Sequence, residues 1–274
     1  MPITKAIIPV AGWGTRRLPI TKAIEKCMLP IGNRPLVDYI VRDCIKAGIA
    51  DIYFVVSKGS SQLQQYFGDN EELNQFLRYN GKESMIELAR PPQNVRFHYI
   101  EQDPNQKYGS AVPVALAFPF LQKGESAAVM MGDDFLYNPD GASELARLMG
   151  LTPEGGNSMV AVQVVPNEVS RYGVIQFNED TGAFEQIVEK PQPAQAPSNY
   201  INVSKYILNY DVMTRVHNYC DLELSGEYNL TDPINQYVLD NGIVQVVPAQ
   251  GQYLDGGSVH GWLHANNVVV NGAQ

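Results

Sequence analysis

The sequence predicts an α/β fold, in which a Rossmann-like, mixed and mostly parallel sheet is flanked by helices. Two observations lead to this prediction. In the first half of the chain, short apolar runs alternate with stretches of helical spacing, and such alternation is typical of βαβ units with parallel strands. In the second half, strand-like runs follow one another with only loops between them, which indicates that further strands join the same sheet.

The elements of the first half follow from apolar periodicity and from the residues that stop it. Residues 5–10 (KAIIPV) form an apolar run that ends in a glycine turn, which predicts a buried strand. Residues 35–47 carry apolar side chains at helical spacing, and Gly48 is a C-terminal stop. The other expected strands are 51–56, 95–100 and 127–131, and the other expected helices are 61–67, 71–77 and 110–117.

The second half is predicted to add strands and to end in helices. We expect one helix to begin near Asp211 and another near Thr231 or Asp232, where Pro233 suits the first turn. The expected strands are 159–165, 173–177, 183–188, 202–208, 243–247 and 252–254, and 261–269 is a candidate final helix. The proline-containing stretch 191–198 has the composition of a surface loop rather than a hinge, so we expect a single domain over residues 1–274, with functional halves of about 1–135 and 136–274.

Composition and charge exclude several classes of function. The chain has 20 Lys and Arg against 29 Asp and Glu, so its formal net charge is −9, whereas a binder of nucleic acid or of an anionic membrane would show a basic footprint. No apolar run approaches the roughly 20 residues that span a bilayer. The cysteines, Cys27, Cys44 and Cys220, lack CxxC spacing, so we expect no disulfide framework, no zinc site and a cytoplasmic setting.

A glycine-rich segment, residues 11–17 (AGWGTRR), directly follows the first expected strand. Gly12 and Gly14 let the backbone approach a ligand, and successive backbone N–H groups there can form a concavity for an anion. Basic side chains, which suit phosphate, follow closely along the chain. They are Arg16, Arg17, Lys22 and Lys26, opposed by Glu25. The segment therefore predicts a phosphate site.

Three other interpretations of the glycine segment compete with this one. A dinucleotide fingerprint needs a third glycine at position 17, which is occupied by Arg17, and a Walker A motif is absent. A plain strand-to-helix turn with a solvated basic face remains the third alternative. The agreement between the glycine loop and the sign of the nearby charge favours phosphate over that plain turn.

Aspartates end two of the apolar runs and are candidate ligands of Mg²⁺. Asp133 and Asp134 follow the run 127–131, and Asp255 follows the run 252–254 and precedes two glycines. Mg²⁺ typically takes one or two carboxylates and lets substrate phosphates complete its shell. An Asx turn at each strand end is the structural alternative. The combination with the glycine loop favours the metal.

With the glycine segment, the basic residues and the aspartates taken together, the sequence resembles the sugar-1-phosphate nucleotidylyltransferases. Residues 5–30 (KAIIPVAGWGTRRLPITKAIEKCMLP) are similar to the signature of that family, and in particular to its bacterial subgroup that acts on UTP and glucose 1-phosphate, AGxGTRxLPxTKxxPKxMLP. Further matching motifs occur in order along nearly the whole chain: Gly132-Asp133-Asp134, Tyr172-Gly173-Val174, Val188-Glu189-Lys190-Pro191, Pro197-Ser198-Asn199, Gly226-Glu227 with Leu230-Thr231-Asp232, and Asp255-Gly256-Gly257.

The resemblance implies a nucleotide-diphospho-sugar transferase fold and a set of site residues. The first half would bind the nucleotide, and the second half, with its C-terminal helices, the sugar. The implied nucleotide-binding residues are Ala11, Gly12, Gly14, Thr15, Arg16, Gln102, Gly109 and Asp133. The implied sugar-phosphate residues are Gly173, Glu189, Lys190 and Asn199, the implied metal ligands are Asp133 and Asp255, and the implied catalytic residues are Arg16, Lys26, Asp133 and Lys190.

Two positions depart from the family pattern. Glu25 stands where the family usually has proline and places a negative charge beside Lys26. Lys107 occupies the place of a glycine near the base, with Gly109 two positions further on, so the uracil contacts are less secure than the sugar-phosphate chemistry. The segment after Asp255 is also short, so the contacts of the homo-oligomer that we expect, a dimer or a tetramer, can differ from those of longer relatives.

The function implied by the resemblance is transfer of a uridylyl group from UTP to glucose 1-phosphate with Mg²⁺, which yields UDP-glucose and pyrophosphate. Such transfer needs positioning and charge neutralisation more than acid–base groups, so His98, His217, His260 and His264 are expected to be structural or exposed, although His260 could approach the site. The alternatives are an enzyme that uses dTTP or CTP, a weakly active regulatory paralogue, and an NAD-dependent dehydrogenase, which the broken fingerprint disfavours.

Overall fold

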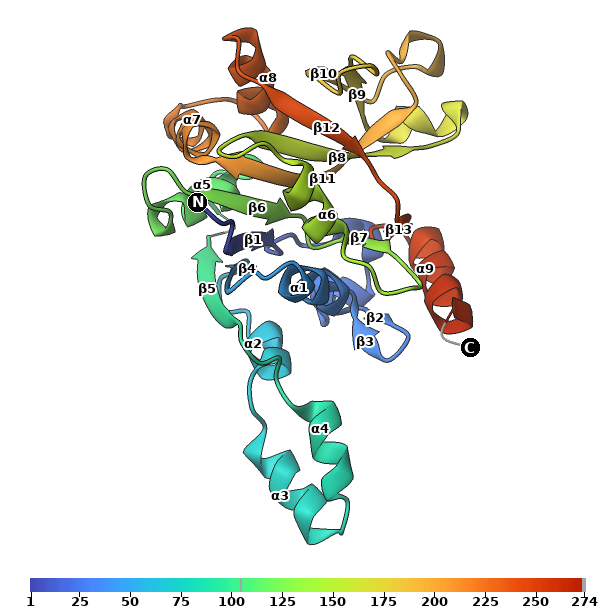
Figure 1. The fold of residues 1–274 in the computed structure, drawn as a ribbon. Coiled ribbons are helices and arrows are strands. Elements are labelled where there is room, and N and C mark those ends of the chain that lie inside the picture. The colour runs from blue at the N-terminus through green and yellow to red at the C-terminus, as the bar shows by residue number, and fades with distance from the viewer. Residues whose placement is uncertain (104, 273–274) are drawn as a thin grey trace.

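Both halves of the chain contribute strands to one sheet. In the computed structural model, which describes residues 1–103 and 105–272, this described part forms a nine-stranded sheet in the order β10-β9-β11-β6-β1-β4-β5, with β8 beside β11 and β12 beside β8 (Figure 1). Its strands are β1 (Lys5–Pro9), β4 (Asp51–Ser57), β5 (Arg96–Gln102), β6 (Ser126–Met130), β8 (Asn157–Gln163), β9 (Gly173–Phe177), β10 (Phe184–Glu189), β11 (Tyr200–Asn209) and β12 (Val244–Pro248).

The pairing directions explain the two sequence patterns. Strand β1 runs parallel to β4 and β6, and β4 runs parallel to β5, so the carboxyl ends of these strands meet at one edge. The inner strands are buried on both faces, which accounts for their continuous apolar runs. Strand β11 is antiparallel to β6, β8 and β9 and thereby joins the second half to the first. The predicted fold class, a mixed sheet flanked by helices, is confirmed.

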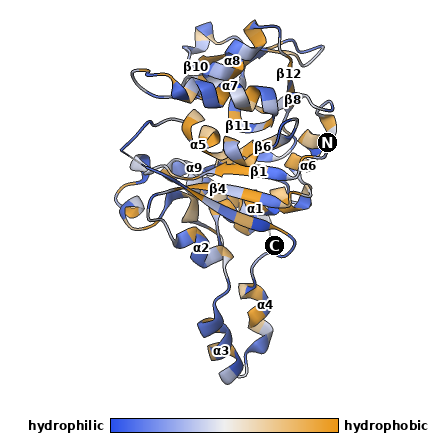
Figure 2. Ribbon diagram, turned by 90° about the vertical axis from the view of Figure 1, so that its left-hand side faces the viewer, coloured by the Kyte–Doolittle hydropathy of each residue, from blue (hydrophilic) through white to orange (hydrophobic). Residues whose placement is uncertain are grey.

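Helices cover both faces of the sheet and enclose two hydrophobic cores. Helices α1 and α6 pack on one face, and α5, α7 and α8 pack on the other, while the apolar strands lie between them (Figure 2). The helices are α1 (Leu36–Lys46), α2 (Gln62–Phe67), α3 (Glu71–Tyr79), α4 (Ile86–Ala89), α5 (Ala111–Ala117), α6 (Glu144–Leu151), α7 (Tyr210–Asp221), α8 (Thr231–Leu239) and α9 (Val259–Gly272). Helices α3 and α4 project from the body as an arm (Figures 1 and 2).

Two short antiparallel ribbons lie outside the main sheet. One pairs β2 (Pro30–Ile31) with β3 (Arg34–Pro35), and the other pairs β7 (Asp134–Tyr137) with β13 (Gln252–Asp255). The expectation that the strand at 252–254 joins the main sheet is therefore wrong, because its partner β7 gives no apolar alternation long enough to be recognised. Helix α6 was likewise absent from the prediction.

The helices of the described residues include none that is both long and apolar enough to cross a membrane.

Candidate active site

An open cleft lies at the carboxyl ends of the parallel strands, where α/β sheets bind ligands. Its volume is about 690 Å³, and the glycine segment after β1, the end of β5 and the turn after β6 line it. The predicted nucleotide-binding residues all line this cleft, and so does Lys26; the set is Ala11, Gly12, Gly14, Thr15, Arg16, Lys26, Gln102, Gly109 and Asp133. The fold thus brings together residues that are far apart in the sequence.

Hydrogen bonds fix the backbone of the glycine segment, and the segment is open to a ligand around Gly12. Gly14 has a φ of +61°, and an added Cβ would lie 3.0 Å from atoms of both Thr21 and Lys26, so this position needs glycine. The Thr21 hydroxyl donates to the Gly14 carbonyl at 2.9 Å, and the Ser57 hydroxyl donates to the Ala11 carbonyl at 2.7 Å. Around Gly12 no atom lies within 4 Å of an added Cβ. The backbone is therefore fixed and still accessible to a ligand.

A charged pair lies on the floor of the cleft. The Lys26 ammonium donates to Oδ2 of Asp133 at 2.5 Å, and 38% of the Asp133 side chain is exposed. Burial raises the pKa of Asp133, but Lys26, together with Lys205 and Arg16, outweighs burial and holds this pKa below its ordinary value. The carboxylate is therefore charged at neutral pH, as a ligand for a cation must be.

Asp255, at the end of β13, approaches the same group from the C-terminal segment. Its Oδ1 accepts from the Gly257 amide at 2.6 Å, and its Oδ2 accepts from the Ser258 hydroxyl at 2.9 Å. A Cβ added to Gly257 would lie 2.9 Å from Oδ1 of Asp255, 3.3 Å from Nη2 of Arg16 and 3.4 Å from Nζ of Lys26. Two cations and the Asp255 carboxylate thus lie around Gly257, and Lys26 in turn pairs with Asp133, so a larger residue at position 257 would fill the space beside these charges.

This arrangement fits a Mg²⁺ ion that binds together with a phosphate ligand. The donors are carboxylate oxygens, which Mg²⁺ prefers, and the described residues contain no group of three His, Cys, Asp or Glu side chains that could cage an ion by themselves. Phosphate oxygens and water would therefore complete the shell, and Arg16 and Lys26 supply the positive charge that a triphosphate requires. The space that Gly257 leaves open is consistent with this fit.

Lys107, which departs from the family pattern, lines the cleft, but its ammonium is held by other groups of the chain. The Lys107 ammonium points to the segment before α8 and donates to the carbonyls of Cys220 at 2.9 Å and of Leu222 at 3.0 Å. Gly109 has a φ of +127°, and an added Cβ would lie 2.3 Å from the Tyr228 carbonyl oxygen. The position that requires glycine is therefore Gly109, beside the lining residue Gln102.

The predicted sugar residues lie outside the cleft lining, Gly173 at the start of β9, Glu189 and Lys190 at the end of β10, and Asn199 just before β11. Gly173 pairs with Glu189 across these strands, and an added Cβ on Gly173 would lie 3.0 Å from Oε1 of Glu189. Burial, together with Asp232 and Glu227, raises the pKa of Glu189 although Lys190 opposes the shift. Because Glu227 itself lines the cleft, this acidic group adjoins the nucleotide side.

The remaining sugar candidates differ in how they are held. Lys190 is exposed and has a φ of +45°, which is rare for a residue with a side chain. The backbone carbonyl of Asn199 accepts from the Val164 amide at 2.9 Å, so this residue also closes the loop beside β8.

Two members of the basic run do not belong to the cleft lining. Lys22 is exposed elsewhere on the surface, and Arg17 is only 4% exposed and donates to backbone carbonyls of Gly256 and Ser258. The expectation that the whole run forms a phosphate cradle is thus wrong for Arg17, whose guanidinium is buried against backbone carbonyls. A run of like charges cannot reveal which members are buried, because a short 3₁₀ turn, Thr15–Arg17, sends successive side chains in different directions.

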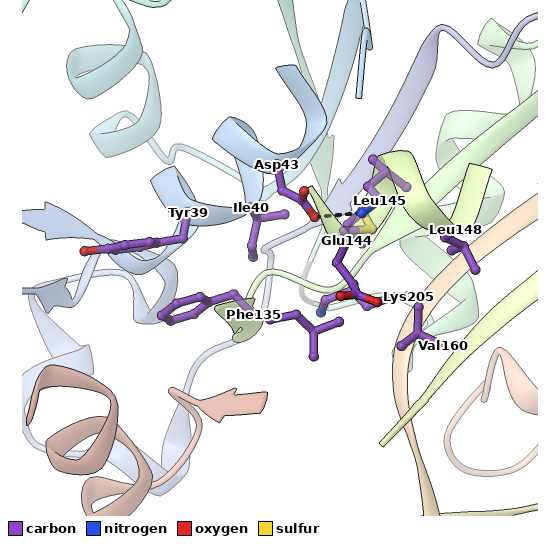
Figure 3. Close-up of a pocket in the computed structure, with 11 residues that line it drawn as sticks. Tyr39, Ile40, Asp43, Phe135, Glu144, Leu145, Leu148, Val160 and Lys205 are labelled. Carbon is purple, nitrogen blue, oxygen red and sulfur yellow. Dashed lines mark hydrogen bonds between the residues drawn. The ribbon is translucent and has the colours of Figure 1, made fainter. Parts of the chain in front are cut away.

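Directly behind Asp133, Asp134 turns into the interior and pairs with Lys205. Burial raises the pKa of Asp134 to about 6, although Lys205 opposes the shift. Lys205 lines a narrow interior cavity between α1 and α6, together with Asp43 and Glu144 (Figure 3). The volume of this cavity is about 10 Å³, which is close to the space for one water molecule and far too small for a nucleotide.

The histidines play other parts. His98 binds Asp51 and stacks on Tyr53, and His217 stacks on Phe118. His260 and His264 are exposed on α9, and the cleft lining contains neither.

Sequence reasoning gave no role to several residues that line the cleft. Tyr108, Ser110 and Glu227 lie there, and Glu227 belongs to a quoted motif to which no function was attached. Tyr108 and Ser110 flank Gly109, so their adjacency to this predicted nucleotide-binding glycine is the sequence signal that could have identified them. Arg17 and Lys205 give no local signal, because their partners are more than 70 positions away.

Comparison with known proteins places this geometry in context. A family model described as nucleotidyl transferase matches residues 5–271. A curated UTP–glucose-1-phosphate uridylyltransferase of Pseudomonas aeruginosa is 34% identical over 270 residues, which are 97% of this chain and 95% of the relative. A UTP-bound UGPase structure from Acinetobacter baumannii is 29% identical with a TM-score of 0.86, over 97% of this chain and 93% of the other. A UDP-glucose pyrophosphorylase structure complexed with UDP-glucose is 28% identical with a TM-score of 0.80, over 98% of this chain and 99% of the other.

Proposed function

Because the chain belongs to the nucleotidyl transferase family, we propose that it is the enzyme that transfers a uridylyl group from UTP to glucose 1-phosphate. The observation that carries the proposal is the cleft lined by the glycine segment, Arg16, Lys26 and Asp133, with Asp255 next to Arg16 and Lys26 at Gly257. The names of near-full-length relatives support the choice of substrates. The products would be UDP-glucose and pyrophosphate.

The reaction is an in-line displacement at phosphorus. A phosphate oxygen of glucose 1-phosphate would attack the α-phosphorus of UTP, the bond to the β-phosphate would break, and pyrophosphate would leave with the bonding electrons. Positioning and charge neutralisation dominate such transfers. Arg16 and Lys26, which both line the cleft and lie close to Gly257, would neutralise the triphosphate and the departing pyrophosphate.

Mg²⁺ is part of the proposal. Asp133 and Asp255 would hold the ion, which when bound offsets the negative charge that develops on the phosphates. In the absence of ligand, Lys26 already neutralises Asp133 at 2.5 Å. A phosphate that reaches the site would compete for this ammonium and leave the carboxylate available to the cation.

The two sides of the cleft would select the substrates. Gln102 presents an amide that can donate to and accept from the edge of uracil, and Gly109, which packs on the Tyr228 backbone, lines the cleft together with it. On the other side, Gly173, Glu189 and Asn199 would contact the glucose hydroxyls and Lys190 the sugar phosphate. We therefore expect Lys190→Ala to raise the KM for glucose 1-phosphate about tenfold, the loss of roughly 1.4 kcal/mol, and to leave the KM for UTP unchanged.

The test of the proposed function is a nucleotide panel. The protein with Mg²⁺ and glucose 1-phosphate is offered UTP, dTTP or CTP, pyrophosphate release is measured, and the sugar nucleotide is identified by mass spectrometry. The expected result is a kcat/KM for UTP at least about a hundredfold above the others. Preference for dTTP or CTP would identify the alternative nucleotidylyltransferase, and no release with any nucleotide would favour a regulatory paralogue.

Assembly and location complete the proposal. We expect a dimer or a tetramer of this chain, which sedimentation of the purified protein would measure. A cytoplasmic location suits an enzyme that uses UTP, and fractionation of cells that express the tagged chain would check it.

A further inference from the structure

Arg17 is a buried cation that faces away from the proposed substrates. Its Nη1 donates to the Ser258 carbonyl at 2.7 Å and to the Gly256 carbonyl at 3.3 Å. Its guanidinium lies over the ring of Trp262, 5.1 Å from the centroid. Burial lowers the pKa of Arg17 and the nearby Asp255 carboxylate opposes the shift, so the group stays charged at neutral pH. Carbonyl oxygens and an aromatic face thus take the place of water around this charge.

The two carbonyls belong to the turn that holds Asp255. Between them lies Gly257, whose amide donates to Oδ1 of Asp255, while the Ser258 hydroxyl donates to Oδ2. The neighbouring Arg16 approaches the same turn from the cleft side, since its Nη2 would lie 3.3 Å from a Cβ on Gly257. Arg17 therefore bonds to the carbonyls of the turn, while the neighbouring Arg16, which lines the cleft, lies close to Gly257 of the same turn.

Further contacts connect this region to helix α9. The Trp262 indole donates to the Pro30 carbonyl at 2.7 Å, and the Asn266 side chain accepts from the Gly32 amide at 2.9 Å. These contacts join α9 to the β2–β3 ribbon, which follows directly after Lys26. Among the residues that make these contacts, Arg17 is the one that belongs to the glycine segment.

We propose that Arg17 is a positioning residue that holds the Asp255 turn in register with the glycine segment. The proposal rests on the proposed function, in which a triphosphate binds the segment and Asp255 serves the same phosphates. A shift of about 1 Å between such groups costs up to about a hundredfold in rate. Loss of Arg17 should therefore lower kcat and raise the Mg²⁺ requirement, and it should leave the sugar side, at β9 and β10, unaffected.

The experiment compares Arg17→Met with Arg17→Lys and Trp262→Phe, and uses Arg78→Met on the projecting arm as the matched control. Arg78 is half exposed and pairs with Glu71, far from the cleft. Hydrogen–deuterium exchange of residues 255–262 is measured without substrates. Steady-state kinetics then give kcat, both KM values and the Mg²⁺ concentration for half-maximal rate.

We expect exchange at 255–262 to be about tenfold faster in Arg17→Met, kcat to fall about thirtyfold, and the half-maximal Mg²⁺ concentration to rise several-fold. The KM for glucose 1-phosphate should stay within about twofold. Arg17→Lys keeps the charge and should recover part of each effect, and Trp262→Phe keeps an aromatic face under the guanidinium but loses the hydrogen bond to Pro30, so it should have a smaller effect than Arg17→Met. Arg78→Met should match the unmodified protein.

Two outcomes would overturn the proposal. Unchanged exchange at 255–262 in Arg17→Met would show that Arg17 does not hold the turn, and faster exchange with unchanged kcat and Mg²⁺ requirement would reduce Arg17 to a structural residue. Failure of the proposed function looks different, because the unmodified protein would then release no pyrophosphate from UTP. In that case the exchange measurement alone still decides whether Arg17 holds the Asp255 turn.

Discussion

The cleft and the interior layer behind it each contain an aspartate–lysine pair, and the two aspartates are neighbours in the chain. In the cleft, Lys26 binds Asp133, whose side chain is 38% exposed. In the interior, Lys205 binds Asp134, and these side chains are only 2% and 12% exposed. The residue types are the same, but Asp134 begins strand β7 and turns into the core whereas Asp133 faces the ligand space.

This difference shows how solvent access assigns a role to the same pair of charges. An accessible pair gains little net energy, because water competes with each partner, so a phosphate and a cation can replace the partners at small cost. A buried pair cannot be opened in this way, since a charge left alone in the core is strongly unfavourable. The hydroxyl of Tyr253 also donates to Asp134, at 3.1 Å, and fixes the inner carboxylate further. We therefore assign ligand binding to the outer pair and stability to the inner one.

The largest expected effect comes from Asp133→Asn. This change keeps the shape of the side chain and removes the charge that would bind Mg²⁺, so turnover with UTP and glucose 1-phosphate should fall by a factor on the order of 10⁴, or about 5.4 kcal/mol. The free energy of unfolding should change by less than about 1 kcal/mol, because the pair is accessible. Pyrophosphate release and urea unfolding measure the two quantities.

Asp180→Asn is the control for this comparison. Asp180 is exposed in the turn between β9 and β10, so the same chemical change there should affect neither quantity. Full activity of Asp133→Asn at saturating Mg²⁺ would remove Asp133 from the metal site.

The opposite pattern is expected for Lys205→Met. The change leaves Asp134 unpaired in the core, where the loss of one partner typically costs about 3 to 5 kcal/mol. It also removes the hydrogen bond that the Lys205 ammonium donates to the Met131 carbonyl at 3.1 Å. Urea unfolding should register this loss, and the double variant Asp134→Asn with Lys205→Met should recover part of it. A cost below about 1 kcal/mol for the single variant would mean that the inner pair behaves like the outer one.

The two aspartates should also differ in how they titrate. Because the pKa of Asp134 is raised to about 6, the folded state binds its proton more tightly than the unfolded state, and the contribution of Asp134 to stability should fall as pH rises from about 4 to 6. Asp133 has a lowered pKa, so its contribution should be present above the ordinary aspartate value and be lost as pH falls through the lowered one. Urea unfolding across this range, with Asp134→Asn as the reference, measures the first slope. If the free energy of unfolding of the unmodified protein, relative to that of Asp134→Asn, rose between pH 4 and 6, the raised pKa of Asp134 would be contradicted.

The outer pair, Lys26 with Asp133, could be predicted from the sequence, whereas the inner pair, Asp134 with Lys205, could not. Lys26 lies in a continuous motif with the glycine segment, and Asp133 follows an apolar strand whose carboxyl end meets the same edge, so strand order alone brings them together. Asp134 and Lys205 are separated by 71 positions and meet only because β11 returns antiparallel beside β6. No periodicity in the sequence encodes that return.

The strands of the fold were predictable for a related reason. Residues such as Ile7, Phe54 and Val129 belong to strands buried on both faces, and their unbroken apolar runs identify them. Strand β7 has no such run, because its four residues start with Asp134, directly after Asp133, and are only partly buried, and the position of its partner β13 was therefore not predictable. Arg17 was read as one more phosphate ligand, since its carbonyl partners carry no mark in the sequence.

The smallest expected effect concerns Glu25, the acidic residue beside Lys26. Its Oε1 accepts from the Ser60 hydroxyl at 2.7 Å, while the Lys26 ammonium donates to Asp133 instead. Glu25→Gln keeps an acceptor for Ser60, so kcat and the KM for UTP should change by less than about twofold, and stability by at most about 1 kcal/mol. Ser60→Ala is the matched variant and should have an equally small effect. A tenfold lower KM for UTP in Glu25→Gln would show instead that this carboxylate repels the triphosphate. The charges that control UTP binding would then include Glu25 in addition to the outer pair, Lys26 and Asp133.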